Sequence, residues 1–233
     1  MKKRKIIHAH NYYLQPGGED TAFVSEVKLL REHGHDVIEY VEDNHTIETR
    51  SPASVAAQTL WSWNTTRKLS LLLEREKPDI VHFHNTFPLI SPSAYYACQT
   101  ARVPVIQSLD NPRLMCPSAN FFRDGGLCQD CLGRTPPWPG VVHSCYRGSA
   151  LQTAVVASML TLHRAMRTWN SRVDFYLVAT EFYRQKFIEG GLAPEKIVVK
   201  PHFTRSDSGA SVAEERGNYA IFVGRLDPEK GVR

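Results

Sequence analysis

The chain has 233 residues, 42% of them hydrophobic and 22% charged, and its formal net charge is +4 at pH 7. This composition is typical of a globular protein with a full core, and the charge is too small to indicate a nucleic-acid partner. No apolar run approaches the roughly 18 residues of a membrane span, and the basic residues 2–5 precede no signal-peptide core. We therefore expect a cytoplasmic protein. The basic start is either a solvated leader or a peripheral contact with an anionic inner membrane face.

Short apolar runs alternate with helical patterns through the first half of the chain. The expected strands cover residues 5–10, 36–41, 79–84 and 103–108, and the expected helices cover 20–31, 53–76 and 91–100. Gly34 is expected to close the first helix as its C-cap glycine, and the second helix is expected to break near Asn64. This alternation of strand and helix is the pattern of an α/β domain.

The same alternation resumes after a long irregular loop that begins at residue 109. A helix is expected over 150–169, a strand over 174–179, a helix over 181–189 and a strand over 196–201. The strands are near-continuous apolar runs, which predicts a parallel sheet covered on both faces. We therefore expect a doubly wound, Rossmann-like α/β domain over residues 1–203.

Composition changes after this domain. Residues 204–218 are small and polar, so they are expected to form a linker. Residues 219–233 follow with a new strand, expected over 218–224, and a short basic loop. Because a single strand cannot bury itself, the sequence predicts a second α/β domain that is truncated soon after it begins.

Two glycine or basic loops are candidates for binding phosphate. Gly17 and Gly18 follow the first expected strand, where glycines let backbone N–H groups approach a phosphate at a helix N-terminus. A tight turn needs glycines equally. Arg225 and Lys230 stand five residues apart near the end of the chain and can clamp a diphosphate, although an ordinary basic loop explains them as well.

Histidines mark the ends of two expected strands. His84 and Asn85 end the third strand, at the carboxyl edge where open α/β sheets bind ligands. We expect His82 and His84 to point to opposite faces of the sheet, with His82 packed in the core. His8 and His10 repeat this pattern on the first strand, with His10 nearer the edge.

The long loop contains four cysteines in the spacing C-x11-C-x2-C-x13-C: Cys116, Cys128, Cys131 and Cys145. Thiolates in a C-x2-C pair suit tetrahedral zinc, and His143 can replace one sulfur. An iron–sulfur cluster fits the spacing less well. A structural zinc and four separately buried thiols remain as alternatives, and disulfides are not expected in a reducing compartment. Cys98 is expected in the core.

Four segments resemble, in this order, the family-four retaining glycosyltransferases of the GT-B fold. They are PGGE at 16–19, LLREHGHDV at 29–37, PDIVHFHNTFPLISPS at 78–93 and VGRLDPEKGV at 223–232. The cysteine loop is similar to that of a bacterial polysaccharide-type subgroup. The resemblance implies an N-terminal domain that holds the acceptor, a C-terminal domain that holds a nucleotide-sugar, and transfer with retention that needs no metal for catalysis.

The resemblance also implies a donor site. Gly17 and Gly18 would lie beside the diphosphate of a UDP- or GDP-sugar. Arg225 and Lys230 would stabilise the leaving diphosphate by compensating its charge.

On the acceptor side, the resemblance implies that His84 belongs to the catalytic centre and that Asn85 and Thr86 bind a glycan or lipid-linked acceptor. One motif departs from the family. Its members carry Leu-His-Asn-Tyr or Leu-His-Asp after the fourth strand, whereas this chain has Asp110 at the histidine position. A carboxylate at that position can still accept a hydrogen bond from a sugar hydroxyl, so Asp110 is our second catalytic candidate.

The family's Glu-x7-Glu element, which holds the donor sugar and ribose, has no counterpart in the 233 residues. We therefore expect this chain alone to bind nucleotide-sugars weakly. The expected function is sugar transfer in cell-surface polysaccharide synthesis. The alternative is a non-catalytic acceptor-binding or accessory module with a zinc-stapled loop. A GT-B epimerase of UDP-sugars shares the fold and is a third interpretation.

Overall fold

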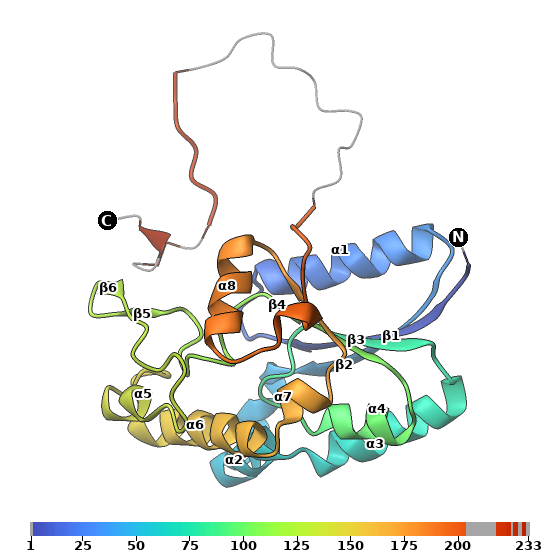
Figure 1. The fold of residues 1–233 in the computed structure, drawn as a ribbon, viewed down its shortest axis with the longest axis horizontal. Coiled ribbons are helices and arrows are strands. Elements are labelled where there is room, and N and C mark those ends of the chain that lie inside the picture. The colour runs from blue at the N-terminus through green and yellow to red at the C-terminus, as the bar shows by residue number, and fades with distance from the viewer. Residues whose placement is uncertain (1, 204–217, 225, 228–229, 232–233) are drawn as a thin grey trace.

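A computed structural model describes residues 2–203, 218–224, 226–227 and 230–231. Its centre is a six-stranded parallel sheet in the order β2-β1-β3-β4-β7-β8 (Figure 1). The strands are β1 (Lys5–Tyr12), β2 (Asp36–Asp43), β3 (Ile80–Phe83), β4 (Val105–Leu109), β7 (Phe175–Val178) and β8 (Ile197–Val199). The predicted α/β class and the doubly wound, Rossmann-like parallel sheet are confirmed.

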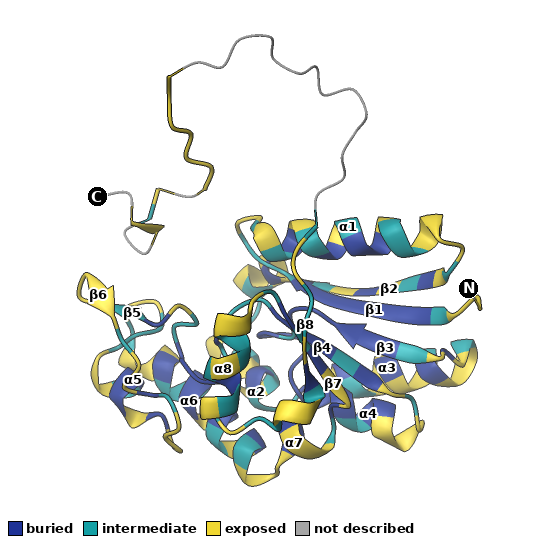
Figure 2. Cartoon of the chain, turned by 45° about the horizontal axis from the view of Figure 1, so that its top comes forward, coloured by how far each residue is buried: buried dark blue, intermediate teal, exposed yellow. Residues whose placement is uncertain are grey.

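Helices connect the strands and cover both faces of the sheet. The longer ones are α1 (Gly18–Glu32), α2 (Pro52–Leu60), α3 (Trp63–Glu76), α4 (Ala94–Thr100), α6 (Ala150–Ala165) and α8 (Glu181–Glu189). Short helical turns cover Asn44–Thr49, Thr168–Ser171 (α7) and Pro194–Lys196. Figure 1 shows α1 on one face and α3, α4 and α6 on the other. The strands between them are mostly buried (Figure 2), as the continuous apolar runs predicted.

The strand order reverses next to β1. The chain leaves β1 for β2 on one side and returns through β3 on the other, so the carboxyl ends of β1 and β3 are neighbours. Ala9 pairs with Phe83 in this ladder, which brings the next residues, His10 and His84, to the same edge. Such a reversal is where open α/β sheets hold their ligands.

Helix boundaries follow local capping chemistry. The break expected near Asn64 lies at Trp61 and Ser62, because Ser62 begins a new helix and its Oγ accepts a hydrogen bond from the Thr65 N–H at 3.3 Å. Gly34 has a φ of +82°, as expected of a glycine after a helix C-cap.

Two expected elements are wrong in extent or type. The helix expected over 150–169 ends at Ala165, because Arg167 turns into the left-handed region with a φ of +54° before the short α7 begins. The strand expected over 218–224 is not formed. These residues are exposed, and within the described part of the chain no strand pairs with them.

The cysteine loop is more ordered than an irregular connection. It contains a two-stranded antiparallel hairpin, β5 (Phe122–Arg123) and β6 (Gly126–Leu127), and the short helix α5 (Trp138–Val142). Asp124 and Gly125 join the hairpin strands with φ of +52° and +80°. Both central residues of a type I′ turn need positive φ, which explains the Asp-Gly sequence.

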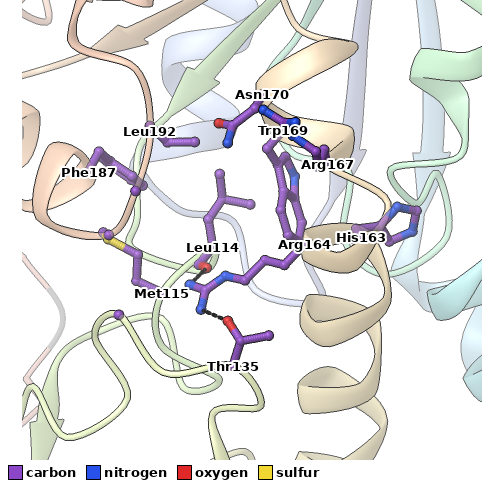
Figure 3. A pocket seen from close by; sticks show the side chains of 13 residues that line it. Leu114, Met115, Thr135, His163, Arg164, Arg167, Trp169, Asn170, Phe187 and Leu192 are labelled. Atoms are coloured by element: carbon purple, nitrogen blue, oxygen red, sulfur yellow. Dashed lines mark hydrogen bonds between the residues drawn. The ribbon is translucent and has the colours of Figure 1, made fainter.

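Arg164 of α6 fastens this loop to the domain. Its guanidinium donates to the Leu114 carbonyl at 2.8 Å and to Thr135 Oγ1 at 3.0 Å (Figure 3). It also donates to the Arg134 carbonyl at 2.6 Å. The planar fork of arginine serves three acceptors at once. A pocket of about 170 Å³ opens beside it, between the loop, α6 and α8, and none of the expected site residues lines it.

His163 joins α6 to the end of α2 and to α7 through a chain of hydrogen bonds. Its Nε2 lies 2.9 Å from the Leu60 carbonyl and its Nδ1 3.0 Å from Thr168 Oγ1, which also contacts the Tyr96 hydroxyl at 2.8 Å. Burial lowers the pKa of His163, while its hydrogen bond to the Leu60 carbonyl raises it less. The imidazole therefore stays neutral in the folded chain below the pH at which it charges in the unfolded chain.

This difference predicts acid sensitivity. Below the unfolded pKa of about 6.5, the unfolded chain binds a proton at His163 that the folded chain does not, so the free energy of unfolding falls as pH falls. The contribution of His163 has a slope of up to about 1.4 kcal/mol per pH unit. Urea unfolding at pH 5, 6 and 7 should show a shallower slope for His163→Gln than for the unmodified chain. Equal slopes would contradict this account.

Candidate functional site

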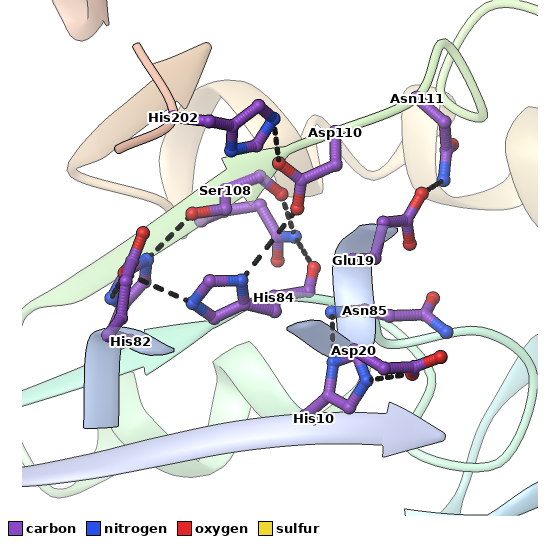
Figure 4. A network of polar contacts seen from close by, with 12 residues as sticks. His10, Glu19, Asp20, His82, His84, Asn85, Ser108, Asp110, Asn111 and His202 are labelled. Carbon is purple, nitrogen blue, oxygen red and sulfur yellow. Dashed lines mark hydrogen bonds and ion pairs between the residues drawn. The ribbon is translucent and has the colours of Figure 1, made fainter. Parts of the chain in front are cut away.

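Asp110 stands directly after β4, at the carboxyl edge of the sheet. Its side chain is 12% exposed and lies between two imidazoles (Figure 4). Oδ2 is 3.7 Å from His84 Nδ1, and Oδ1 is 3.9 Å from His202 Nε2. Because His84 is buried and His202 is more than half exposed, Asp110 joins the interior of the sheet to the open side of the edge.

His82 and His84 do not point to opposite faces, so that prediction is wrong. Residues two apart on a strand share a face, and the two ring centroids lie 4.7 Å apart. His8 joins them from β1, with Nε2 2.8 Å from His82 Nδ1. The expectation that His82 is buried is confirmed, and its other nitrogen contacts Ser108 Oγ at 2.9 Å.

Glu26 of α1 lies over these histidines. Its Oε2 is 3.3 Å from His84 Nε2, and its Oε1 bonds the ammonium of Lys200. Burial raises the pKa of Glu26, but His84 and Lys200 outweigh it and lower the value to about 2. Burial lowers the pKa of His84, yet the Asp110 and Glu26 carboxylates leave it raised. Basic and acidic side chains thus alternate from Lys200 through Glu26 and His84 to Asp110.

The other two histidines of this cluster are neutral. Burial, followed by the charge of His84, lowers the pKa of His8 to about 3. Burial and the neighbouring His8 and His84 lower the pKa of His82 well below its ordinary value.

A second carboxylate, that of Glu19, lies beside Asp110 at this edge of the sheet. Its Oε1 accepts a hydrogen bond from Asn111 Nδ2 at 2.6 Å, and its Oε2 accepts one from the Tyr13 hydroxyl at 2.9 Å. Burial raises the pKa of Glu19, and the bonds from Asn111 and Tyr13 oppose that shift. Two acidic groups therefore lie close together at the reversal point of the sheet.

Asn85 and Thr86, the expected acceptor-binding residues, both lie at this edge, but their burial differs. The Asn85 side chain is buried, donates to the carbonyls of Asn11 and Phe87, and accepts from the Phe87 N–H at 3.0 Å. These bonds fix the loop after β3 and use the hydrogen-bonding groups of the amide. Thr86 is partly exposed.

Gly17 and Gly18 lie at the start of α1, next to this cluster. A Cβ at either residue would meet nothing within 4 Å, and Gly17 has an ordinary extended φ of −136°. Neither packing nor a positive φ therefore explains the glycines. Asp20 holds the turn: its Oδ2 accepts from the Gly17 N–H at 2.7 Å while Oδ1 contacts His10 Nε2 at 2.7 Å.

Of the two expected diphosphate residues near the end of the chain, only Lys230 belongs to the part that the structure describes. Lys230 is exposed, and its backbone N–H donates to the Asp227 carbonyl at 2.9 Å. Arg225 lies outside the described residues.

The cysteines of the loop are free thiols, Cys116 and Cys131 buried and Cys128 and Cys145 partly exposed. Burial, followed by the charges of Cys116, Cys145 and Cys128, raises the pKa of Cys131 to about 11 against the opposing backbone hydrogen bond of Gly140, so the four cysteines lie near one another. In the described residues their sulfurs do not form a group placed to share a metal ion. Zinc would have to draw them together. Cys98 is buried in the core, as expected.

Sequence reasoning missed Glu26, Lys200 and His202. Glu26 carried a readable signal, because it interrupts the apolar stripe of α1 formed by Phe23 and Val27, and a carboxylate on a buried helix face needs a polar partner. Lys200 and His202 follow the last strand and gave no comparable signal.

Residues 17–202 match the family model described as the glycosyl transferase 4-like domain. None of the curated proteins matches the sequence at a significant level. The match spans most of the chain, including Gly17 and Gly18, Glu26, His82, His84, Asp110 and the cysteine loop.

Similar solved structures include two proteins from bacteria and one from a plant. An S. aureus MnaA–UDP complex is 14% identical, with a TM-score of 0.46 over 84% of this chain and 43% of that chain. A UDP-N-acetylglucosamine 2-epimerase from Rickettsia bellii is 12% identical, with a TM-score of 0.48 over 86% and 45%. UGT73P12 from Glycyrrhiza uralensis is 9% identical, with a TM-score of 0.43 over 85% and 48%. The chain thus spans less than half of each of these proteins, and at such identities the likeness concerns the fold alone.

Proposed function

The chain belongs to the glycosyl transferase 4-like family, and we propose that it forms the acceptor side of a glycosyltransferase that uses a nucleotide-sugar. The donor is a UDP- or GDP-sugar, and the sugar passes with retention to a glycan or lipid-linked acceptor in cell-surface polysaccharide synthesis. The protein works in the cytoplasm, with peripheral contact to the inner face of the membrane. In the described residues no helix is long and apolar enough to cross a membrane.

The position of Asp110 is the observation that carries this proposal. Its carboxylate lies at the reversal point of the sheet, held between His84 and His202, where it can accept a hydrogen bond from a sugar hydroxyl. Gly17 and Gly18 leave the start of α1 open beside it, and backbone N–H groups at a helix start favour a diphosphate.

The test is a transfer assay on the full-length protein that carries this chain. Purified protein is incubated with UDP- and GDP-sugars and with glycan and polyprenyl-phosphate acceptors. We expect nucleoside diphosphate to be released only when an acceptor is present, and NMR of the product to show the anomeric configuration of the donor. Conversion of a UDP-sugar without acceptor would instead indicate an epimerase. Acceptor binding without any turnover would indicate an accessory module.

We also propose that the cysteine loop binds one structural zinc through Cys116, Cys128, Cys131 and Cys145. Thiolates at this spacing suit tetrahedral zinc, and the mutual effect on the pKa of Cys131 supports their proximity. Cys128→Ser should remove about one equivalent of zinc and lower the melting temperature, because structural zinc contributes directly to folding. Cys98→Ser is the matched control and should keep the zinc. Equal zinc content and stability in Cys128→Ser and the unmodified chain would contradict the proposal.

A further inference from the structure

One group of side chains among the described residues is placed to share a metal ion, and it is not the cysteines. Its ligand atoms come from His8, Glu26, His82 and His84 and lie within 4.8 Å of one another. All four residues are buried. They come from the paired strands β1 and β3, from the residue directly after β3 and from α1.

The distances between these atoms fit tetrahedral coordination. His8 Nε2 is 2.8 Å from His82 Nδ1, and Glu26 Oε2 lies 3.9, 3.8 and 3.3 Å from His8 Nε2, His82 Nδ1 and His84 Nε2. A zinc ion with bonds of about 2.0–2.1 Å separates its tetrahedral ligands by roughly 3.3 Å. The four separations given lie within about 0.6 Å of this value, and all four ligand atoms lie within 4.8 Å of one another.

One outward ring nitrogen, His82 Nε2, has the hydrogen-bond partner that a metal-bound histidine needs, and a second, His84 Nδ1, faces a carboxylate. His82 Nε2 lies 2.9 Å from Ser108 Oγ, and His84 Nδ1 lies 3.7 Å from Asp110 Oδ2. Such outer partners fix the ring orientation and leave the inward nitrogen lone pair for the metal. Both ring nitrogens of His84 are buried and lack a hydrogen-bond partner, which a bound metal would remedy at Nε2.

We propose that His8, His82, His84 and Glu26 bind a divalent transition-metal ion of the zinc type. Three imidazole nitrogens and one carboxylate oxygen are a ligand set of intermediate softness that suits zinc. Lys200 bonds Glu26 Oε1, which leaves Oε2 for the metal, and Asp110 offsets part of the added positive charge. This site is closed and structural: by fixing His84 it holds the ring that faces Asp110. The proposal does not depend on the proposed function.

The test uses the full chain, stripped of metal by a chelator and titrated with zinc or cobalt(II) alone. Total zinc is measured by mass spectrometry, and cobalt gives a visible spectrum whose intensity reports tetrahedral coordination. Glu26→Gln keeps the size of the side chain and removes the anionic ligand. Glu39→Gln, an exposed carboxylate of β2 that pairs with Arg31, is the matched control. Cys128→Ser separates this site from the cysteine loop.

We expect Glu26→Gln to lose one zinc equivalent, or to raise the zinc dissociation constant by more than about 100-fold, while Glu39→Gln and Cys128→Ser keep that equivalent. If Glu26→Gln unfolds, cobalt bound to Cys128→Ser should still show a tetrahedral spectrum without thiolate absorption. Absence of that spectrum, zinc content that is the same in Glu26→Gln and Glu39→Gln, or no zinc in Cys128→Ser would overturn the proposal.

Discussion

Asp110→Asn in the full-length protein should lower the kcat/KM for sugar transfer by about 10²-fold. The substitution keeps the shape of the side chain but removes the anion that lies between His84 and His202. A carboxylate that accepts a proton from a reacting group in the transition state typically raises the reaction rate by roughly 10²–10⁴-fold. The measurement is steady-state release of nucleoside diphosphate at several acceptor concentrations.

The control for this effect is Asp36→Asn. Asp36 is an exposed carboxylate at the opposite end of the sheet, where β2 begins, so its loss should leave kcat/KM within about threefold. Thermal unfolding of both variants separates a lost function from a lost fold. If Asp110→Asn retained full activity in a folded protein, Asp110 would have no catalytic role and the catalytic group would have to be sought elsewhere on the edge.

The arrangement of strands was predictable because a parallel sheet buries every strand on both faces. Residues 80–83 and 175–178 are continuous apolar or aromatic runs that could be recognised without knowing their partners. The expected strand ends also put His84 and Asp110 at the carboxyl edge of a parallel sheet. The secondary-structure elements and their carboxyl ends depend on local sequence and could therefore be predicted.

Contacts between distant elements were less accessible. Glu26 meets three histidines only because α1 crosses β1 and β3 at one particular angle, which no local pattern encodes. The shared face of His82 and His84, in contrast, was predictable, because side chains two residues apart on a strand point to the same side. The hairpin in the cysteine loop was also readable, because Asp124-Gly125 is a strong signal for a tight turn. The left-handed turn at Arg167 that follows the end of α6 could not be predicted, because the local sequence does not distinguish Arg167 from other surface arginines.

Gln107→Leu should lower the free energy of unfolding by about 2–5 kcal/mol. Gln107 is buried on β4, where its Oε1 accepts from the Tyr95 hydroxyl at 2.6 Å and its Nε2 donates to the carbonyls of His84 and Ser108. Leucine has a similar volume but cannot accept a hydrogen bond from the Tyr95 hydroxyl. Because Tyr95 is only 1% exposed, this hydroxyl loses its amide partner in a buried position. Urea unfolding measures the loss, and Gln152→Leu on the exposed side of α6 should be nearly neutral.

A second substitution distinguishes an unpaired hydroxyl from a packing defect. Tyr95→Phe removes the hydroxyl that Gln107→Leu leaves without a partner. The free energy of unfolding of the double variant should therefore be about 1–2 kcal/mol higher than that of Gln107→Leu alone. Additive losses would show that packing, rather than hydrogen bonding, dominates at this position. Because Gln107 also holds the carbonyl of His84, the same network that stabilises the core fixes the backbone from which His84 reaches Asp110. Loss of Gln107 should therefore lower transferase activity in the full-length protein even under conditions in which the fold is retained.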